Sequence, residues 1–251
     1  MNLLHPYFNN YSFAGFVHRG GNEEKTENTL EAFQHASDLG FIFMETDVQA
    51  TNDDEIVVFH DNTLNRLAGV DKKISDLSSY EIRNIDLING GRIPSLNELL
   101  SSFPNLRFNI DIKTNDAVEK SIDIINQHTA FNRVCLAAFS STRLKKIRKI
   151  CGDKLCSSMG MSEVFNLVLK SYGFPLNTNQ GNCAQVPISY FGFPVVNKKF
   201  INAAHTTNKL VHVWTIDEES EINNLIDLGV DGVMTDKPSV LMKVLKKRNL
   251  I

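Results

Sequence analysis

Eight times along the chain, a short β-rich apolar run is followed by a longer segment whose apolar residues recur with the period of a helix. The expected strands are Ala14–Val17, Phe41–Asp47, Arg107–Ile112, Arg133–Phe139, Lys154–Ser158, Cys183–Pro187, Leu210–Trp214 and Gly232–Thr235. The expected helices are Thr29–Leu39, Ser95–Phe103, Ala117–His128, Thr142–Ile150, Ser162–Leu169, Lys198–Thr206, Glu218–Leu228 and Ser239–Lys246. Eight such units predict an α/β fold, the (β/α)8 TIM-type barrel.

The section after the second expected strand breaks this alternation. Thr51–Asp54 has the composition of a turn, Glu55–Phe59 is a second extended run, and a polar stretch continues to Arg92. We therefore expect a hairpin and a small insertion, approximately residues 52–93, at the strand end where barrel enzymes build their sites. An open doubly wound sheet is disfavoured, because no Gly-x-Gly-x-x-Gly follows the first strand. Residues 1–251 are expected to form a single barrel domain.

Charge and composition exclude several classes of protein. The chain has 26 Lys and Arg against 29 Asp and Glu, a net charge of −3, which disfavours binding to nucleic acid. No stretch is long and apolar enough for a membrane span, and the first residues lack a basic segment followed by an apolar run. The four cysteines form no Cys-x-x-Cys pair, which predicts buried, reduced thiols. These features predict a cytoplasmic protein; a homodimer is one of the oligomeric states left open.

Polar clusters follow four of the extended runs, at the points where the runs end. They are His18-Arg19, Glu45-x-Asp47, His60-Asp61 and Asp111-x-Lys113. Since residues i and i+2 of a strand project to the same face, each spaced pair is expected on one face. Each cluster alone has an ordinary structural explanation, such as a turn pair or a surface salt bridge. Their joint placement at strand ends favours a single site.

The residue types at this site predict a particular chemistry. Three converging carboxylates (Glu45, Asp47 and Asp111) repel one another unless a hard divalent cation neutralises them, and oxygen ligands favour Mg²⁺ or Ca²⁺ over Zn²⁺. Arg19 and Lys113 beside that cation would bind an anion such as phosphate.

Two histidines complete the predicted chemistry. His18 and His60 can exchange protons near neutral pH, one as acid and one as base. The set predicts metal-assisted cleavage of a phosphate ester.

Several motifs closely resemble the glycerophosphodiester phosphodiesterase family of the bacterial cytoplasmic type. They are His18-Arg19-Gly20, Glu27-Asn28-Thr29, Glu45-Thr46-Asp47-Val48, Val58-Phe59-His60-Asp61, Val213-Trp214-Thr215 and Gly229-Val230-Asp231-Gly232-Val233-Met234-Thr235-Asp236. The resemblance runs from about Phe16 to Pro238 and implies hydrolysis of a small glycerophosphodiester to glycerol 3-phosphate and an alcohol.

The same resemblance implies roles for individual residues. It makes Glu45, Asp47 and Asp111 the ligands of one divalent cation, Mg²⁺ or Ca²⁺, and His18 and His60 the acid–base pair. Arg19 and Lys113 would hold the phosphate, and Trp214 would line the glycerol pocket. Where this chain has Asp111 the family usually has Glu, so direct and water-mediated binding of the metal both stay open.

Two alternatives to this function are retained. A lysophospholipase D or sphingomyelinase D-like enzyme would need an apolar rim near the mouth, and the stretch Asn62–Arg92 is too polar to predict one. A catalytically inactive barrel would bind a phosphorylated ligand without turnover, against which the intact histidine pair argues. The order in which the two histidines act stays open, as does the choice between attack by water and a cyclic phosphate route.

Overall fold

A computed structural model describes residues 5–251; the first four residues of the expected domain lie outside the described residues. Eight parallel strands form a nearly closed barrel in the order β6-β5-β4-β2-β1-β11-β10-β7. Their bounds are β1 Ala14–His18, β2 Phe43–Ala50, β4 Arg107–Ile112, β5 Val134–Ala137, β6 Cys156–Ser157, β7 Cys183–Val186, β10 Leu210–Val213 and β11 Gly232–Thr235. Between β6 and β7 the contact is a single bridge, Ser158 to Cys183. The predicted barrel is confirmed.

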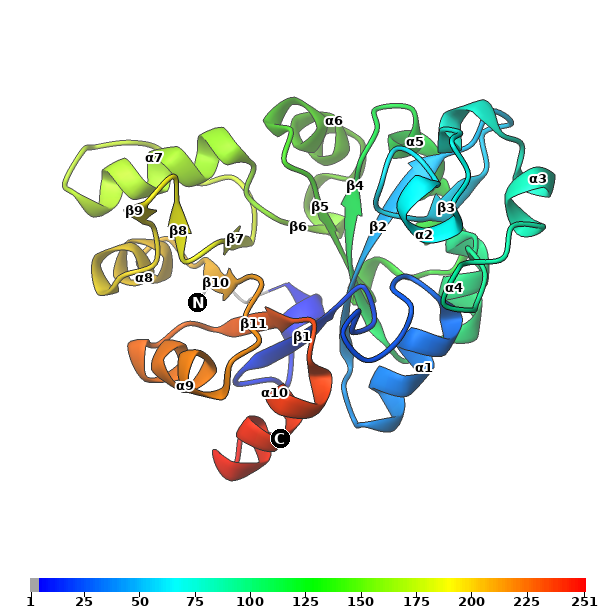
Figure 1. The fold of residues 1–251 in the computed structure, drawn as a ribbon. Helices are drawn as coiled ribbons and strands as arrows, with labels where there is room; N and C mark the ends of the chain where they lie inside the picture. Colours follow the sequence, from blue (N-terminus) through cyan, green and yellow to red (C-terminus); the bar gives the residue numbers. More distant parts are fainter. Residues whose placement is uncertain (1–4) are drawn as a thin grey trace.

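Helices surround this barrel (Figure 1). They are α1 Leu30–Asp38, α4 Leu96–Ser102, α5 Ala117–Gln127, α6 Ser141–Cys151, α7 Met161–Ser171, α8 Lys198–His205, α9 Glu219–Leu228 and α10 Pro238–Lys247. One predicted strand is much shorter than expected, because Gly152–Lys154 forms a 3-10 turn (η4) and leaves only Cys156–Ser157 extended. No helix among residues 5–251 has both the length and the apolar character needed to cross a bilayer.

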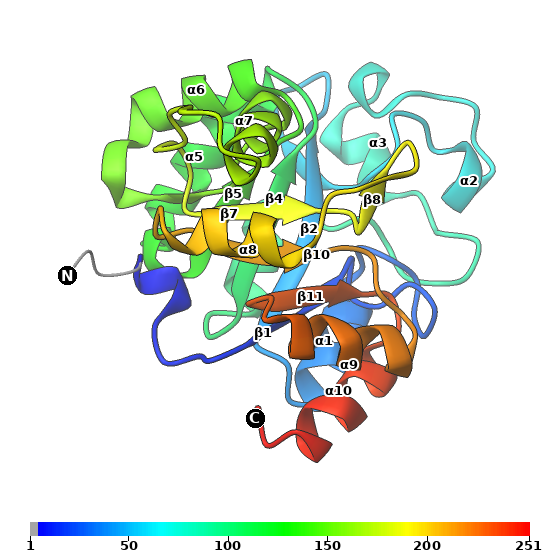
Figure 2. The same ribbon diagram turned by 90° about the vertical axis from the view of Figure 1, so that its left-hand side faces the viewer.

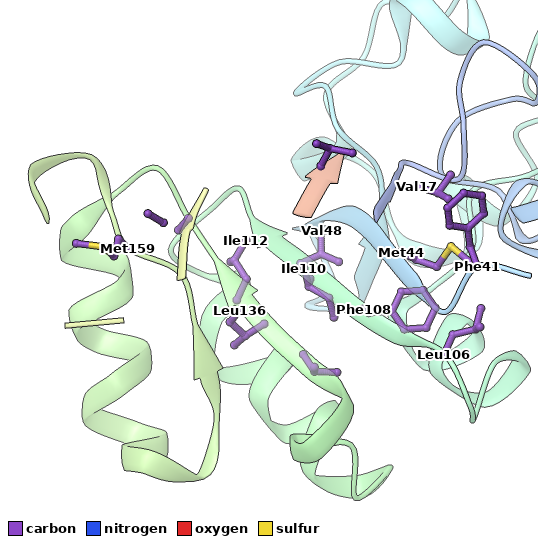
Figure 3. Packing of buried hydrophobic residues seen from close by; sticks show 14 of the residues in the cluster. Val17, Phe41, Met44, Val48, Leu106, Phe108, Ile110, Ile112, Leu136 and Met159 are labelled. Carbon is purple, nitrogen blue, oxygen red and sulfur yellow. The ribbon is translucent and has the colours of Figure 1, made fainter. Parts of the chain in front are cut away.

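Alternation along the strands separates two environments. On β4, Phe108, Ile110 and Ile112 pack into the apolar layer between sheet and helices, together with Met44 and Val48 of β2 (Figure 3). The intervening residues of β4 face the barrel interior. Asn109 there accepts a hydrogen bond of 2.8 Å from Gln185 of β7, a strand that is not its neighbour. The two-residue period therefore directs the acidic residues of β2 and β4 inward.

The amino-terminal end of the barrel interior is filled by apolar and thiol side chains. A 3-10 turn at Pro6–Phe8 (η1) brings the buried Tyr7 and Phe8 against Phe16 and Phe43. The thiols Cys135, Cys156 and Cys183 lie in the same cluster. All four cysteines are free and buried, which confirms the prediction of reduced thiols.

The predicted insertion is confirmed as a small subdomain after β2. β3 (Ile56–Val58) pairs antiparallel with β2, and the 3-10 turn Ile74–Asp76 (η2) and the short helices α2 (Asn65–Ala68) and α3 (Ser79–Arg83) follow. It has its own buried cluster, which includes Val57, Phe59, Leu64, Ile74, Leu77, Ile82, Leu87 and Ile93. This packing fixes the loop that carries His60.

A second hairpin is not predicted by the sequence pattern. β8 (Ser189–Tyr190) and β9 (Phe193–Pro194) pair antiparallel around a two-residue turn and form a separate two-stranded sheet. The hairpin lies between β7 and α8, and Figure 2 shows it projecting on the side to which β7 and β11 point, as α2 and α3 do.

Gly232→Ala is expected to destabilise the barrel by about 1–3 kcal/mol or more, the range for an overpacked core. A Cβ atom at Gly232 would overlap the carbonyl oxygen of Ala14 on the paired strand, and backbone cannot rotate away as a side chain can. The measurement is the free energy of unfolding in denaturant. Gly15→Ala on β1 is the matched control, because its nearest contacts are the ends of Leu245 and Phe41 side chains. Equal losses in both variants would contradict the prediction.

Candidate active site

The strand register brings the predicted acids and one histidine together at the carboxyl end of the barrel. His18 on β1 lies opposite Glu45 on β2, and Asp47 lies opposite Asp111 on β4. Glu45, Asp47 and Asp111 are all buried. The i, i+2 spacing therefore places the acids as predicted, on the inner face of adjacent strands.

Glu45 and Asp47 differ in the form that their surroundings favour. Burial, and then the charge of Asp47, raise the pKa of Glu45 to about 8. Burial also acts on Asp47, but the cations Lys113 and Arg19 outweigh it and hold its pKa below the ordinary value. The surroundings of Asp47 therefore favour its ionised carboxylate form. Those of Glu45 favour its protonated form, because the nearby positive charges do not outweigh its burial and the charge of Asp47.

Lys113 and Arg19 supply the positive charge of the site. The Lys113 Nζ lies 2.8 Å from Asp47 Oδ1 and 2.6 Å from Asp111 Oδ2. The Arg19 Nε lies 3.2 Å from Asp47 Oδ2, and its Nη1 donates to Glu27 Oε1 at 3.2 Å. Both cations thus stand among acids at the mouth, where they can also meet an anionic ligand.

Each of the two predicted histidines is held by its own carboxylate. His18 Nδ1 is 2.7 Å from Asp236 Oδ1, and His60 Nδ1 is 2.7 Å from Asp61 Oδ1. Because a carboxylate only accepts, both Nδ1 atoms carry the proton and Nε2 is left for other partners. His18 Nε2 lies 3.7 Å from Glu45 Oε2. Burial lowers the pKa of His18, but Glu45 and Asp236 outweigh it, and the net pKa is raised above 6.5.

The loop that carries His60 is tied to the barrel and to the loop after β1. The buried Gln49 amide donates to the carbonyl oxygens of Phe59, His60 and Asp61 at 3.0, 3.1 and 2.7 Å.

Arg66 on α2 extends this connection. It donates to Asp61 and, through two nitrogens, to the buried Glu27 at 2.7 and 2.8 Å. Since Glu27 also accepts from Arg19, the insertion and the first loop are joined by one chain of charge-assisted hydrogen bonds.

Trp214 lies beside the charged residues as part of an aromatic wall. Its ring packs edge to face on Phe139, with centroids 5.9 Å apart. The Lys113 ammonium lies 5.9 Å from the centroid of the Phe139 ring. The wall therefore borders Lys113 on one side of the mouth, and Phe139 is exposed there.

The donor chemistry of the acids fits a hard divalent cation. Asp111 Oδ1 is buried without a hydrogen-bond partner, and the positive charges around Glu45 do not outweigh its burial and the charge of Asp47. As the side chains stand in the described residues, no three His, Cys, Asp or Glu lie close enough together to hold a metal ion, so the acids would have to move to bind one. Lys113 contacts Asp47 and Asp111 and balances part of their charge. The residue types thus suit the predicted cation; the cation itself stays a prediction.

Five residues of this network have no role assigned from the sequence, although Glu27, Asp61 and Asp236 lie in the motifs named above: Glu27, Gln49, Asp61, Arg66 and Asp236. Two carried a usable signal. Gln49 continues the inward face of β2 two residues beyond Asp47, and Asp236 follows the last strand at the same edge as the other polar clusters. Asp236 holds His18, which is 218 residues away along the chain.

Comparison with known proteins places this chain in a family. The chain is 33% identical over 227 residues to "Probable glycerophosphodiester phosphodiesterase 2" of Mycobacterium tuberculosis, covering 88% of this chain and 86% of that protein. It is 29% identical over 269 residues to human lysophospholipase D GDPD1, covering 89% and 83%. An Oleispira antarctica phosphodiesterase, solved with the product sn-glycerol-3-phosphate, has the same fold, with a TM-score of 0.76 and 20% identity over 94% of this chain and 96% of that one. The model of the glycerophosphoryl diester phosphodiesterase family matches residues 18–240, and the chain belongs to this family.

Proposed function

We propose that the protein hydrolyses glycerophosphodiesters to glycerol 3-phosphate and an alcohol by acid–base catalysis at His18 and His60. The observation that carries the proposal is the pair of histidines, each with a carboxylate 2.7 Å from Nδ1, beside buried acids and two cations. The product found with the Oleispira antarctica phosphodiesterase is the one expected here.

In this reaction the two histidines have complementary tasks. One Nε2 atom accepts the proton of the attacking group, which is water or the glycerol hydroxyl of the substrate, and the other donates a proton to the oxygen of the leaving alcohol. Arg19 and Lys113 bind the non-bridging phosphate oxygens and stabilise the charge that develops on them. Trp214 and Phe139 provide the apolar wall against which the carbon atoms of glycerol pack.

One divalent cation, Mg²⁺ or Ca²⁺, belongs to the proposal, with Glu45, Asp47 and Asp111 as the residues that would hold it. When bound, such a cation supplies charge neutralisation for the acids and for the phosphate. The orphaned Asp111 Oδ1 and the raised pKa of Glu45 support it. Proton transfer, phosphate binding and glycerol packing are carried out by side chains of the protein itself.

The test is release of glycerol 3-phosphate from a panel of glycerophosphodiesters with different alcohols, glycerophosphocholine among them. We expect turnover of several members, and no release of inorganic phosphate from phosphate monoesters such as glycerol 3-phosphate. Binding of the diesters without any turnover would support an inactive barrel instead. Much faster hydrolysis of a long-chain lysophospholipid would support the lysophospholipase D alternative, the activity that the human relative's name gives.

Asp236→Asn is expected to lower kcat by at least about 10-fold and by up to about 10⁴-fold, the loss found when an amide replaces the carboxylate that orients a catalytic histidine. The asparagine amide can turn its NH2 group toward His18 Nδ1. In that orientation Nδ1 accepts a hydrogen bond, and the proton of the imidazole is no longer held on Nδ1. Asp231→Asn is the matched control, since Asp231 accepts from His205 Nε2 at 2.8 Å on an exposed pair outside this network. Steady-state kcat of both variants checks the prediction, and equal effects would contradict it.

A further inference from the structure

The β8–β9 hairpin exposes aromatic side chains that the fold does not use. Tyr190, Phe191 and Phe193 are 50%, 86% and 76% exposed. Phe191 and Gly192 form the turn with φ of 49° and 81°, a conformation that favours Asn-Gly and disfavours a bulky residue at the first position. Neither burial nor turn preference therefore explains a phenylalanine at the tip. A contact outside the chain would explain it.

The hairpin stands at the mouth of the candidate active site. It directly follows β7, whose last residue, Val186, accepts a hydrogen bond of 3.1 Å from the backbone of Trp214. Figure 2 shows it projecting on the same side as the insertion. The two preceding strand-to-helix connections also carry exposed apolar side chains, namely Phe139 after β5 and Met161 at the start of α7. An apolar rim therefore exists at the mouth. It is formed by the strand-to-helix connections between β5 and α8, and not by the insertion Asn62–Arg92.

The charge pattern around the hairpin identifies its partner. Residues 189–194 contain no charged side chain, whereas the exposed Lys198 and Lys199 follow at the start of α8. Their ammonium groups make only surface contacts, with the Leu228 carbonyl oxygen at 3.2 Å and with the Tyr172 ring at 5.6 Å from its centroid. An uncharged aromatic tip with cations behind it matches a phospholipid surface, where aromatics enter the interface and lysines meet anionic headgroups. The protein as a whole is acidic, with a net charge of −3. Any attraction to anionic headgroups must therefore come from lysines close to the hairpin.

The exposed area argues against a second copy of the chain as the partner. The three aromatic side chains offer roughly 400 Å², taking about 150–250 Å² for a whole aromatic residue. A stable protein interface buries about 800 Å² on each partner. A projecting tip of this size suits shallow insertion into lipid better than a rigid protein contact.

We propose that the hairpin Ser189–Pro194 docks the protein on the surface of an anionic phospholipid bilayer. Phe191 and Phe193 enter the interface, and Lys198 and Lys199 leave their surface contacts with Leu228 and Tyr172 to face the headgroups. Docked in this way, the mouth faces the lipid surface. Docking would bring the active site close to phosphodiesters held in the lipid surface, and this consequence rests on the proposed function. The docking itself does not depend on the proposed function.

The test is co-sedimentation of the full chain with vesicles of phosphatidylcholine containing about one third phosphatidylglycerol. We expect binding by the unaltered protein, and binding at least about tenfold weaker in F191A/F193A, since burying one phenylalanine is worth that much. Phe174→Ala is the matched control, because Phe174 is exposed but lies outside the hairpin, and it should bind as the unaltered protein does. K198Q/K199Q should lose the preference for the anionic vesicles over pure phosphatidylcholine.

A spectroscopic readout separates insertion from loose attachment. Trp214 is the only tryptophan, so Phe191→Trp adds a single new fluorophore, at the tip. Its emission should be quenched by vesicles with brominated acyl chains, with little change in the unaltered protein. The proposal is overturned if the unaltered protein does not sediment, if F191A/F193A binds as Phe174→Ala does, or if the hairpin variant abolishes a dimer seen by analytical ultracentrifugation. Hydrolysis of water-soluble glycerophosphocholine should be unchanged in F191A/F193A, which keeps failure of docking distinct from failure of the proposed function.

Discussion

His18→Ala and His60→Ala are each expected to lower kcat by at least about 10²-fold, the contribution of a positioned general acid or base. Each imidazole is oriented by a carboxylate 2.7 Å from Nδ1, so the geometry needed for proton transfer from Nε2 is already set before substrate binds. Neither residue contributes to the apolar clusters, and the fold should therefore remain. Steady-state kinetics on glycerophosphocholine with thermal unfolding of the same samples measures both effects.

His35→Ala is the control for this pair. His35 on α1 also lies 2.7 Å from a carboxylate, Glu24, but outside the candidate site, so its kcat should stay close to that of the unaltered protein. The double variant of His18 and His60 should lose little more than the worse single variant, because residues that act in one proton-transfer sequence are not additive. Near-normal turnover in either single variant would remove that histidine from the mechanism.

The barrel could be predicted because its information is local and repeated. A strand such as Arg107–Ile112 alternates outward Phe108, Ile110 and Ile112 with inward Asn109 and Asp111, and the same two-residue period sets the face of Glu45 and Asp47. Strand ends of a parallel barrel lie at one edge, so polar residues that follow the strands meet there whatever their separation along the chain. Periodicity and strand order thus predicted that Glu45, Asp47 and Asp111 lie on the inner face of neighbouring strands.

The connections between side chains could not be predicted in the same way. Asp236 and His18 are 218 residues apart, and Arg66 reaches Glu27 from a four-residue helix that has no periodic signal. Such contacts depend on loop conformation, which periodicity does not encode. The β8–β9 hairpin was missed for a related reason: two-residue strands are shorter than any run that alternation can identify, and its turn is Phe-Gly rather than Asn-Gly.

Chelation is expected to abolish hydrolysis, and Mg²⁺ or Ca²⁺ should restore it. The physical reason is the excess of acid at the site: Glu45, Asp47 and Asp111 are buried, while Lys113 and Arg19 leave the pKa of Glu45 raised to about 8. A cation that binds Glu45 must displace its proton, so affinity should increase as pH rises toward 8. The unfolding temperature, measured with and without added cation, gives a readout that does not depend on turnover.

Asp111 decides how the cation is held. Asp111→Glu lengthens the side chain by one methylene and should tighten cation binding if the carboxylate binds directly but at the limit of its reach. Asp111→Asn should weaken it, because a neutral amide replaces a charged ligand whose Oδ1 has no other partner. Asp116→Asn is the control, since Asp116 caps α5 through the N–H of Ala117 and should leave cation affinity unchanged. Full activity in the presence of chelator, or identical cation affinity in all three variants, would show that Lys113 and Arg19 alone balance these acids.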